Sequence, residues 1–202
     1  KLEPNKFYHV EWVFGPDRQE LWIDNEKNAE ADTGASLPGG EGMYVGCTYD
    51  TKRDKQKDGL AAILEDLRIY RAMKDKFPGS RENPTPKNGN PDGLVVDMNF
   101  GSDAAIDDNE KIKDELDHGL VIEMRNPGSM KAGKCDIMPD RDNGSFTFIH
   151  PKTTDAGKLI VGSQIIVNPH DSLKGIKEGT LEIYFRASYP SDSTNFYLVS
   201  ST

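Results

Sequence analysis

The sequence predicts an all-β protein built as an antiparallel β-sandwich. Short segments in which apolar and polar residues alternate recur along the chain, as expected for strands with one buried face. The 19 glycines and 12 prolines among 202 residues suit a fold with many turns. No sustained helical period is present, and only a short helical turn is expected, near residues 110–116. Since sandwiches of about 200–250 residues can form one unit, the length permits one large sandwich or two small domains.

The first elements predict a β-hairpin. Residues 7–14 alternate with a period of two, and three apolar side chains share one face: Val10, Trp12 and Phe14. A Gly-Pro-Asp turn follows. In the next strand, Trp22 points away from the face that carries Leu21 and Ile23. Asp24-Asn25 then closes the hairpin, because these residue types tolerate turn conformations.

The sequence from 32 to 70 predicts two loops and two strands. Residues 32–42 and the charged residues 50–58 form the loops, and between them an inward-facing strand contains Met43, Val45 and Cys47. The strand at 63–70 has an apolar face and a polar face. The apolar face carries Ile63, Leu67 and Ile69, and the polar face carries Asp66, Arg68 and Tyr70.

Residues 75–93 predict a linker, because four prolines, three glycines and three asparagines cannot lie inside a sheet. A second series of strands follows. The apolar residues that mark them are Leu94, Val96, Met98 and Phe100; Phe146 and Phe148; Ile165 to Val167; and Leu181, Ile183, Phe185 and Ala187. The final residues, NFYLVSST, predict one more strand.

Composition narrows the classes of partner. The net charge is −9 and no basic run is present, which argues against nucleic-acid binding. No apolar stretch reaches the roughly 18 residues of a membrane span. Cys47 and Cys135 make neither a disulfide framework nor a zinc site, and whether they pair stays open. Because the chain starts at Lys1 without Met, we expect a mature or excised segment.

Several motifs resemble the laminin G-like, concanavalin A-like lectin and glucanase superfamily. YHVEWV, ELWIDNE, MYVGCT and GLAAILEDLRIYRAM, within residues 7–74, are similar to its closing half. GLVVDMNF, GSFTFIHP and SQIIVNPHDSLKGIKEGTLEIYFRAS, within residues 93–202, are similar to its opening half. The resemblance implies a jelly-roll sandwich whose halves come in reverse order. Asn25-Glu26 replaces the family's usual Asp-Gly, so we expect a less tight turn there.

This reversed order leaves two arrangements open. The first, which we favour because the middle strands of the family are missing, is two half-domains completed elsewhere. Residues 1–74 would be the C-terminal half of one sandwich, 75–93 the linker, and 94–202 the N-terminal half of a second. The other arrangement is one permuted domain. Because the first and last strands of this family lie side by side, the strand at 94–100 would then pair with the strand at 63–70.

The resemblance also implies a structural calcium site shared by the closing and opening strands. Calcium prefers six to eight oxygen ligands. The matching residues are Asp66, Asp97, Asn99 and Asp103. Asp97 and Asn99 are expected on the outward face of their strand, as is Asp66. The alternative is that these carboxylates are solvated and that Asp66 pairs with Arg68 or a lysine.

The candidates for glycan binding are aromatic residues beside polar groups: Trp22, Tyr44 and Tyr184. Trp22 is the best candidate, although a core position is the competing interpretation for all three. Related glucanases carry a Glu-x-Asp-x-x-Glu strand, which this chain lacks. The four histidines lie far apart in the sequence without metal-ligand spacing. We therefore predict a protein that is not an enzyme.

The predicted function is a non-catalytic adhesion or glycan-binding segment of a larger secreted or cell-surface protein. Its partner would be a glycan or an extracellular protein. Two alternatives remain open. One is a self-associating subunit of an extracellular filament, sheath or surface layer, assembled by exchange of sandwich halves. The other is an accessory domain of a polysaccharide-degrading enzyme.

Overall fold

The fold is all-β, as predicted. The computed structural model describes residues 2–37, 42–46, 48–50, 55–57, 62–71, 73, 93–99, 111–112, 116, 119–125, 131–134, 144–148, 152–153, 159–160, 164–187 and 198–201. Within these residues most of the chain is β-strand, and the helical structure is one 3-10 turn at Asp171–Leu173.

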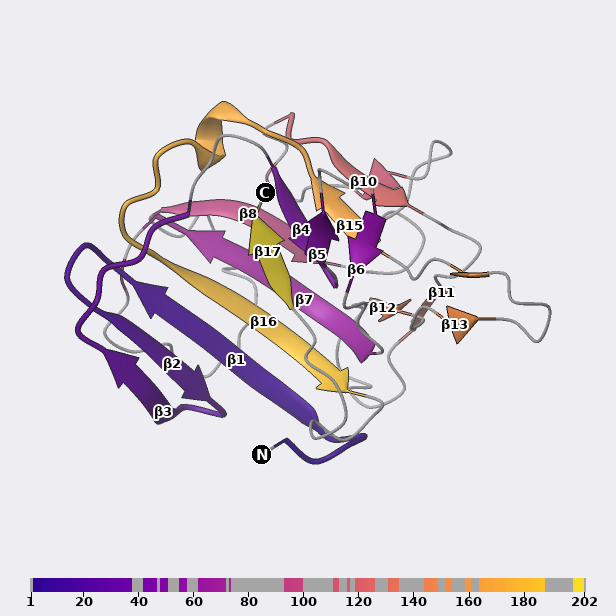
Figure 1. Cartoon of the computed structure of the whole chain (residues 1–202), viewed down its shortest axis with the longest axis horizontal. Coiled ribbons are helices and arrows are strands. Elements are labelled where there is room, and N and C mark those ends of the chain that lie inside the picture. The colour runs from indigo at the N-terminus through magenta and orange to yellow at the C-terminus, as the bar shows by residue number, and fades with distance from the viewer. Residues whose placement is uncertain are drawn as a thin grey trace.

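The larger sheet has eight antiparallel strands. Their bounds are β1 Phe7–Phe14, β2 Gln19–Ile23, β3 Glu26–Ala31, β7 Ala62–Tyr70, β8 Leu94–Asn99, β11 Lys131–Lys134, β12 Gly144–Phe148 and β16 Gly179–Ala187. The order is β11-β12-β7-β16-β1-β2-β3, and β8 also pairs with β7. Strand β7 is long enough to pair with β12 at its start and with β8 further along. Figure 1 shows β8, β7, β16, β1, β2 and β3 side by side.

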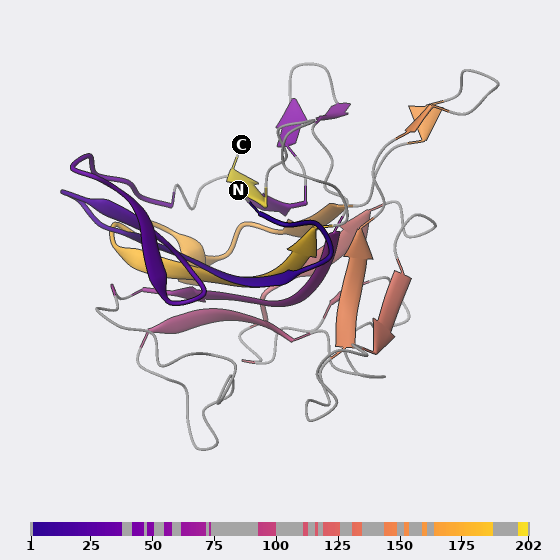
Figure 2. The same ribbon diagram turned by 90° about the horizontal axis from the view of Figure 1, so that it is seen from below.

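The smaller sheet has five antiparallel strands in the order β17-β4-β15-β10-β9. Their bounds are β4 Met43–Val45, β9 Lys111–Ile112, β10 Ile122–Arg125, β15 Gln164–Val167 and β17 Val199–Ser201. Figure 2 shows this sheet above the larger one. Two separate hairpins join β5 Thr48–Asp50 to β6 Lys55–Lys57 and β13 Lys152–Thr153 to β14 Leu159–Ile160. The hairpin of β5 and β6 corrects the loop predicted at 50–58, and β9 corrects the predicted helical turn.

The apolar core combines residues of both sheets. The larger sheet contributes alternate residues of β1, β7, β8 and β16, and the smaller sheet contributes β4, β10 and β15. The fully buried side chains of this core include Phe14, Leu67, Met98, Ile122, Ile165, Ile183 and Phe185. Most of the predicted apolar faces are therefore confirmed. Cys47, Phe100 and Cys135 lie outside the described residues.

One predicted face is wrong because of a β-bulge. The pairing of β7 with β16 passes from Asp66↔Tyr184 to Leu64↔Phe185, so Glu65 is an extra residue in β7. A bulge of this kind shifts the alternation of the strand by one residue. Leu64, rather than the predicted Ile63, therefore joins Leu67 and Ile69 in the core.

The turn between β2 and β3 is tighter than expected. It has only two residues, Asp24 and Asn25, with φ angles of 51° and 68°. Positive φ at both central positions is typical of the two-residue hairpin turn that matches strand twist. Asp and Asn are tolerated in this region, so the turn does not need the glycine that the family usually has.

Strands from the two predicted segments share both sheets. β16, from residues 94–202, lies between β1 and β7, from residues 1–74. In the smaller sheet, β4 pairs with both β15 and β17. The expected pairing of the closing strand β7 with the opening strand β8 is confirmed. This is the strand pairing that the permuted arrangement predicts, while residues 75–92 of the predicted linker lie outside the described part.

Candidate polar site on the larger sheet

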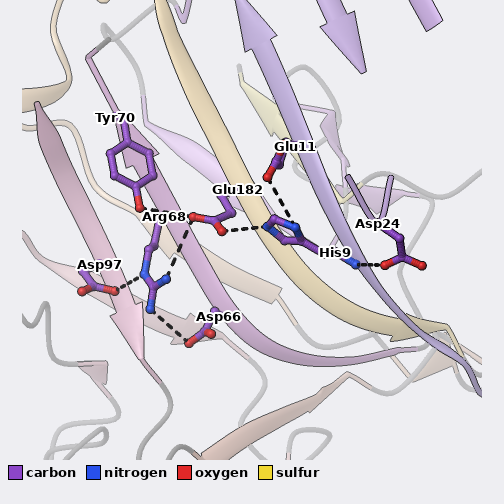
Figure 3. A network of polar contacts seen from close by, with 8 residues as sticks. All are labelled: His9, Glu11, Asp24, Asp66, Arg68, Tyr70, Asp97 and Glu182. Atoms are coloured by element: carbon purple, nitrogen blue, oxygen red, sulfur yellow. Dashed lines mark hydrogen bonds and ion pairs between the residues drawn. The ribbon is translucent and has the colours of Figure 1, made fainter. Parts of the chain in front are cut away.

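Six directly opposed residues form a line across the outer face of the larger sheet, away from the core. In order from β3 to β8 they are Lys27, Trp22, Glu11, Glu182, Arg68 and Asp97. We call this set the register row. Neighbouring strands lie about 4.8 Å apart, so each side chain can contact the next. His9, Asp66 and Tyr70 lie two positions along the same strands. Figure 3 shows these three residues with Asp24 and the four row residues Glu11, Glu182, Arg68 and Asp97.

Burial increases along the register row. Lys27 is exposed and Trp22 is half-buried. The next four side chains retain little exposure: 3% for Glu11, 3% for Glu182, 2% for Arg68 and 4% for Asp97. Because an isolated buried charge is very costly, charges at these positions must be paired. The row therefore has a solvent end, where water can solvate a charge, and a buried end, where each charge needs a partner.

The buried end contains the Arg68 cluster, formed by Arg68, Asp66, Asp97, Tyr70 and Glu182. Arg68 Nε donates to Asp97 Oδ1 at 3.1 Å, and its Nη2 lies 3.9 Å from Asp66 Oδ1. Arg68 Nη1 lies 4.0 Å from Glu182 Oε2, which also accepts a hydrogen bond from the Tyr70 hydroxyl at 3.2 Å. One guanidinium thus faces carboxylates from three strands.

Electrostatics fix the protonation states of this cluster. Burial, the largest influence, lowers the pKa of Arg68, but the three surrounding carboxylates outweigh it and raise that pKa overall. Burial and the charge of Glu182 raise the pKa of Tyr70, so its phenol stays a hydrogen-bond donor. For Glu182, burial raises the pKa, but contacts with His9, Arg68 and Tyr70 together lower it below its ordinary value.

The middle of the face contains the His9 cluster, formed by His9, Glu11 and Glu182. His9 Nε2 lies 2.7 Å from Glu182 Oε1, and His9 Nδ1 lies 3.4 Å from Glu11 Oε1. Both ring nitrogens therefore face carboxylates. Asp24, which is not part of the cluster, fixes the backbone of His9. The His9 N–H donates to Asp24 Oδ1 at 3.0 Å, and the His9 carbonyl accepts from the Asp24 N–H at 2.8 Å.

The solvent end of the row surrounds an indole. Trp22 Nε1 donates to Glu20 Oε2 at 3.0 Å. Glu20 also lies 3.8 Å from Lys27 Nζ and 3.9 Å from Arg18 Nη1. The indole is therefore oriented by a carboxylate and accompanied by two basic side chains.

The three predicted glycan-binding residues do not form one site. Trp22 and Tyr184 share the outer face of the larger sheet, but Tyr184 is buried and stacks on Phe7 with ring centroids 5.4 Å apart. Its ring is therefore not presented to a ligand in this structure. Tyr44 is half-buried on β4 and alternates with the core residues Met43 and Val45, which places it on the outer face of the smaller sheet. Trp22 alone is a half-exposed ring beside charged groups.

The structure brings two of the four predicted calcium residues together, but around a cation. Asp66 and Asp97 both face Arg68, so the alternative in which Asp66 pairs with Arg68 is confirmed. The carboxylates are buried rather than solvated. Asn99 lies opposite Asp66 in the register, and Asp103 lies outside the described residues. Calcium at these positions stays a prediction, and an ion there would have to compete with the guanidinium.

Sequence reasoning missed the His9 cluster. The spacing between the four histidines carries no metal signal, whereas the partners of His9 are carboxylates. A local signal did exist, because His9-x-Glu11 on a strand places both side chains on one face. Glu182 could not be added without the register of β1 against β16, which the sequence does not provide.

Comparison of the chain with protein-family models, with curated protein sequences and with solved structures finds no match. The resemblance to laminin G-like domains therefore rests on the quoted motifs and stays a prediction. The described part of the chain contains no helix with the length and apolar character needed to cross a membrane.

Proposed function

We propose that the chain is a non-catalytic β-sandwich module of a larger secreted or cell-surface protein, and that it binds a glycan over Trp22. The observation that carries the proposal is the solvent end of the register row. There a half-exposed indole is fixed by Glu20 and lies opposite Lys27 in the register. The motifs that resemble laminin G-like domains and the two-sheet architecture agree with it.

The chemistry of these groups suits a sugar. An indole offers a broad apolar face with a polar edge, against which the C–H face of a pyranose ring can pack. Carboxylate and ammonium groups beside the ring can bind the hydroxyls, and a few placed polar groups are what orient a ligand in a binding site. Glu20, Lys27 and Arg18 supply such groups around Trp22.

The burial of the other carboxylates favours binding over catalysis. A glycosidase places two carboxyl groups on either side of a bond that the substrate must bring between them. On this face the carboxylates of Glu11, Glu182, Asp66 and Asp97 are buried, and each contacts His9 or Arg68. These contacts suit a structural network, which leaves the solvent end as the ligand surface.

The chain contains its own control for a binding experiment, because its two tryptophans differ in position. Trp12 packs against the core and donates from Nε1 to Gln19, whereas Trp22 lies on the outer face. A glycan array would first select a ligand, and fluorescence titration would then be compared between Trp22→Phe and Trp12→Phe. We expect the ligand-dependent change to persist in Trp12→Phe and to disappear in Trp22→Phe.

Trp22→Ala should in addition weaken binding about 2- to 13-fold, since one aromatic contact contributes about 0.5–1.5 kcal/mol. Folding of each variant would be checked by circular dichroism. An array without any bound glycan, or equal affinity in Trp22→Ala and the wild type, would overturn the proposal.

A further inference from the structure

We propose that His9, Glu11 and Glu182 form a binding site for a divalent transition-metal ion of the zinc type. This site is separate from the glycan surface and from the predicted calcium residues. The three side chains project from adjacent positions on β1 and β16, where Glu11 and Glu182 are directly opposed. One ligand atom from each residue lies within 4.8 Å of the other two.

Two of the three ligand atoms already lie at the spacing that coordination requires, and the third must move to join them. In a four-coordinate site with metal–ligand bonds of about 2.0–2.2 Å, neighbouring ligand atoms lie about 3.3–3.5 Å apart. His9 Nδ1 and Glu11 Oε1 already lie 3.4 Å apart. Glu182 Oε1 lies 2.7 Å from the other ring nitrogen, Nε2, so on binding this carboxylate must leave Nε2 and swing to the Nδ1 side of the ring to reach the ion. A water molecule can complete the shell.

The donor set selects the class of ion. One imidazole nitrogen with two carboxylate oxygens is a ligand combination that suits zinc and its neighbours in the first transition row. Calcium takes six to eight oxygens and rarely uses imidazole. Two carboxylates also neutralise the double charge of the ion, which suits a site where all three residues are buried.

The surroundings hold the ligands in place, as the outer shell of a metal site does. The backbone of His9 is bonded on both sides by Asp24, at 3.0 Å and 2.8 Å. The Tyr70 hydroxyl donates to Glu182 Oε2 at 3.2 Å, which leaves Oε1 directed at the ring. Tyr70 is thus a positioning residue for this site and has no direct contact with the ion.

The test uses the full chain, stripped with a chelator and titrated with Zn²⁺ and, separately, Co²⁺. We expect binding of one ion per chain by calorimetry. Co²⁺ should give the visible absorption of a four-coordinate site. Ca²⁺ should not compete.

Substitutions then test which side chains bind the ion. Glu182→Gln and His9→Gln should weaken Zn²⁺ binding at least as much as loss of an outer-shell partner, which costs about 10–100-fold. Tyr70→Phe should weaken it by about that amount through its effect on Glu182. The matched control is Glu30→Gln, an exposed carboxylate variant on the same sheet outside the His9 cluster, which should leave zinc affinity unchanged.

A measurement on the wild type tests the proposal even if the variants fail to fold. X-ray absorption of the zinc-loaded chain should show one imidazole and oxygen ligands. Sulfur ligands, which would point to the cysteines, would overturn the proposal. So would a folded wild type that binds no ion, or zinc affinity that is unchanged in folded His9→Gln. Because Glu182→Gln spares Trp22, loss of zinc binding and loss of glycan binding are distinguishable.

Discussion

The Arg68 cluster and the His9 cluster lie on the same face of one sheet and share Glu182, yet they differ in the basic side chain that the carboxylates surround. Both are buried almost completely. In the first, a guanidinium of permanent charge faces carboxylates on β7, β8 and β16. In the second, an imidazole faces carboxylates through both nitrogens. A guanidinium stays protonated and cannot bind a metal, whereas an imidazole can exchange a proton for an ion.

This difference suits the two clusters to different roles. The Arg68 cluster is suited to linking strands, and the His9 cluster is suited to binding an ion. The carboxylates around Arg68 raise its pKa, so the cluster keeps its cation at any ordinary pH. Its contacts link β7 to β8 and β16 and help to fix their register. The His9 cluster has the same burial but an imidazole in place of the guanidinium, and because an imidazole nitrogen can bind a metal ion, the metal site is proposed there.

The largest expected effect comes from removing the permanent charge. Arg68→Met would leave three carboxylates facing one another without the guanidinium, and loss of one partner from a buried charge pair costs about 3–5 kcal/mol. We expect this loss in the free energy of unfolding, measured by urea denaturation. Arg18→Met, which removes an exposed arginine on the same face, is the control. A loss below that of the His9 variant would break the comparison.

A smaller effect is expected at the His9 cluster in the metal-free protein. His9→Gln removes the contacts with Glu11 and Glu182, but the amide can still donate to one carboxylate. Leaving a buried polar group poorly paired costs about 1–3 kcal/mol, which sets the expected loss of unfolding free energy. When the urea experiment is repeated with Zn²⁺, the difference in unfolding free energy between the wild type and His9→Gln should increase, since zinc would stabilise the wild type alone. An equal gain in both proteins would contradict this.

The strands were predictable from the sequence because their alternation reflects one buried face. Leu181, Ile183 and Phe185 are in the core as expected, and Leu21 and Ile23 pack against it. The face of Ile63 was not predictable, since nothing in the local pattern marks the bulge at Glu65. The predicted loop at 50–58 contains a hairpin strand because polar residues can pair through their backbone alone.

The candidate site was predictable only in fragments. Asp66, Arg68 and Tyr70 were correctly placed on one strand face, and Trp22 opposite Leu21 and Ile23. The register row needs the pairing of six strands, and its central pair, Glu11 and Glu182, is separated by most of the chain. The same long-range pairing places β16 between β1 and β7. Strand β16 thus has partners on both sides within this chain.

The smallest effect is expected at an exposed pair on the same sheet, where distance alone would suggest a strong contact. Lys27 Nζ lies 2.6 Å from Glu30 Oε2, closer than Arg68 Nε lies to Asp97. Solvent screens exposed ion pairs, so closeness there adds little to stability. We expect Lys27→Met to leave the urea midpoint unchanged within error.

The Lys27–Glu30 pair should nevertheless be visible in a titration. The hydrogen bond from Lys27, followed by its charge, lowers the pKa of Glu30. A carboxyl whose folded pKa is lowered contributes its stability above its unfolded pKa, and that contribution is lost as the pH falls through the folded pKa. In Lys27→Met, the Glu30 pKa measured by NMR should rise toward its ordinary value, with only a correspondingly small loss of stability at neutral pH, too small to move the urea midpoint beyond error. A fall in stability comparable to that of His9→Gln would mean that pairing, rather than burial, sets the strength of these contacts.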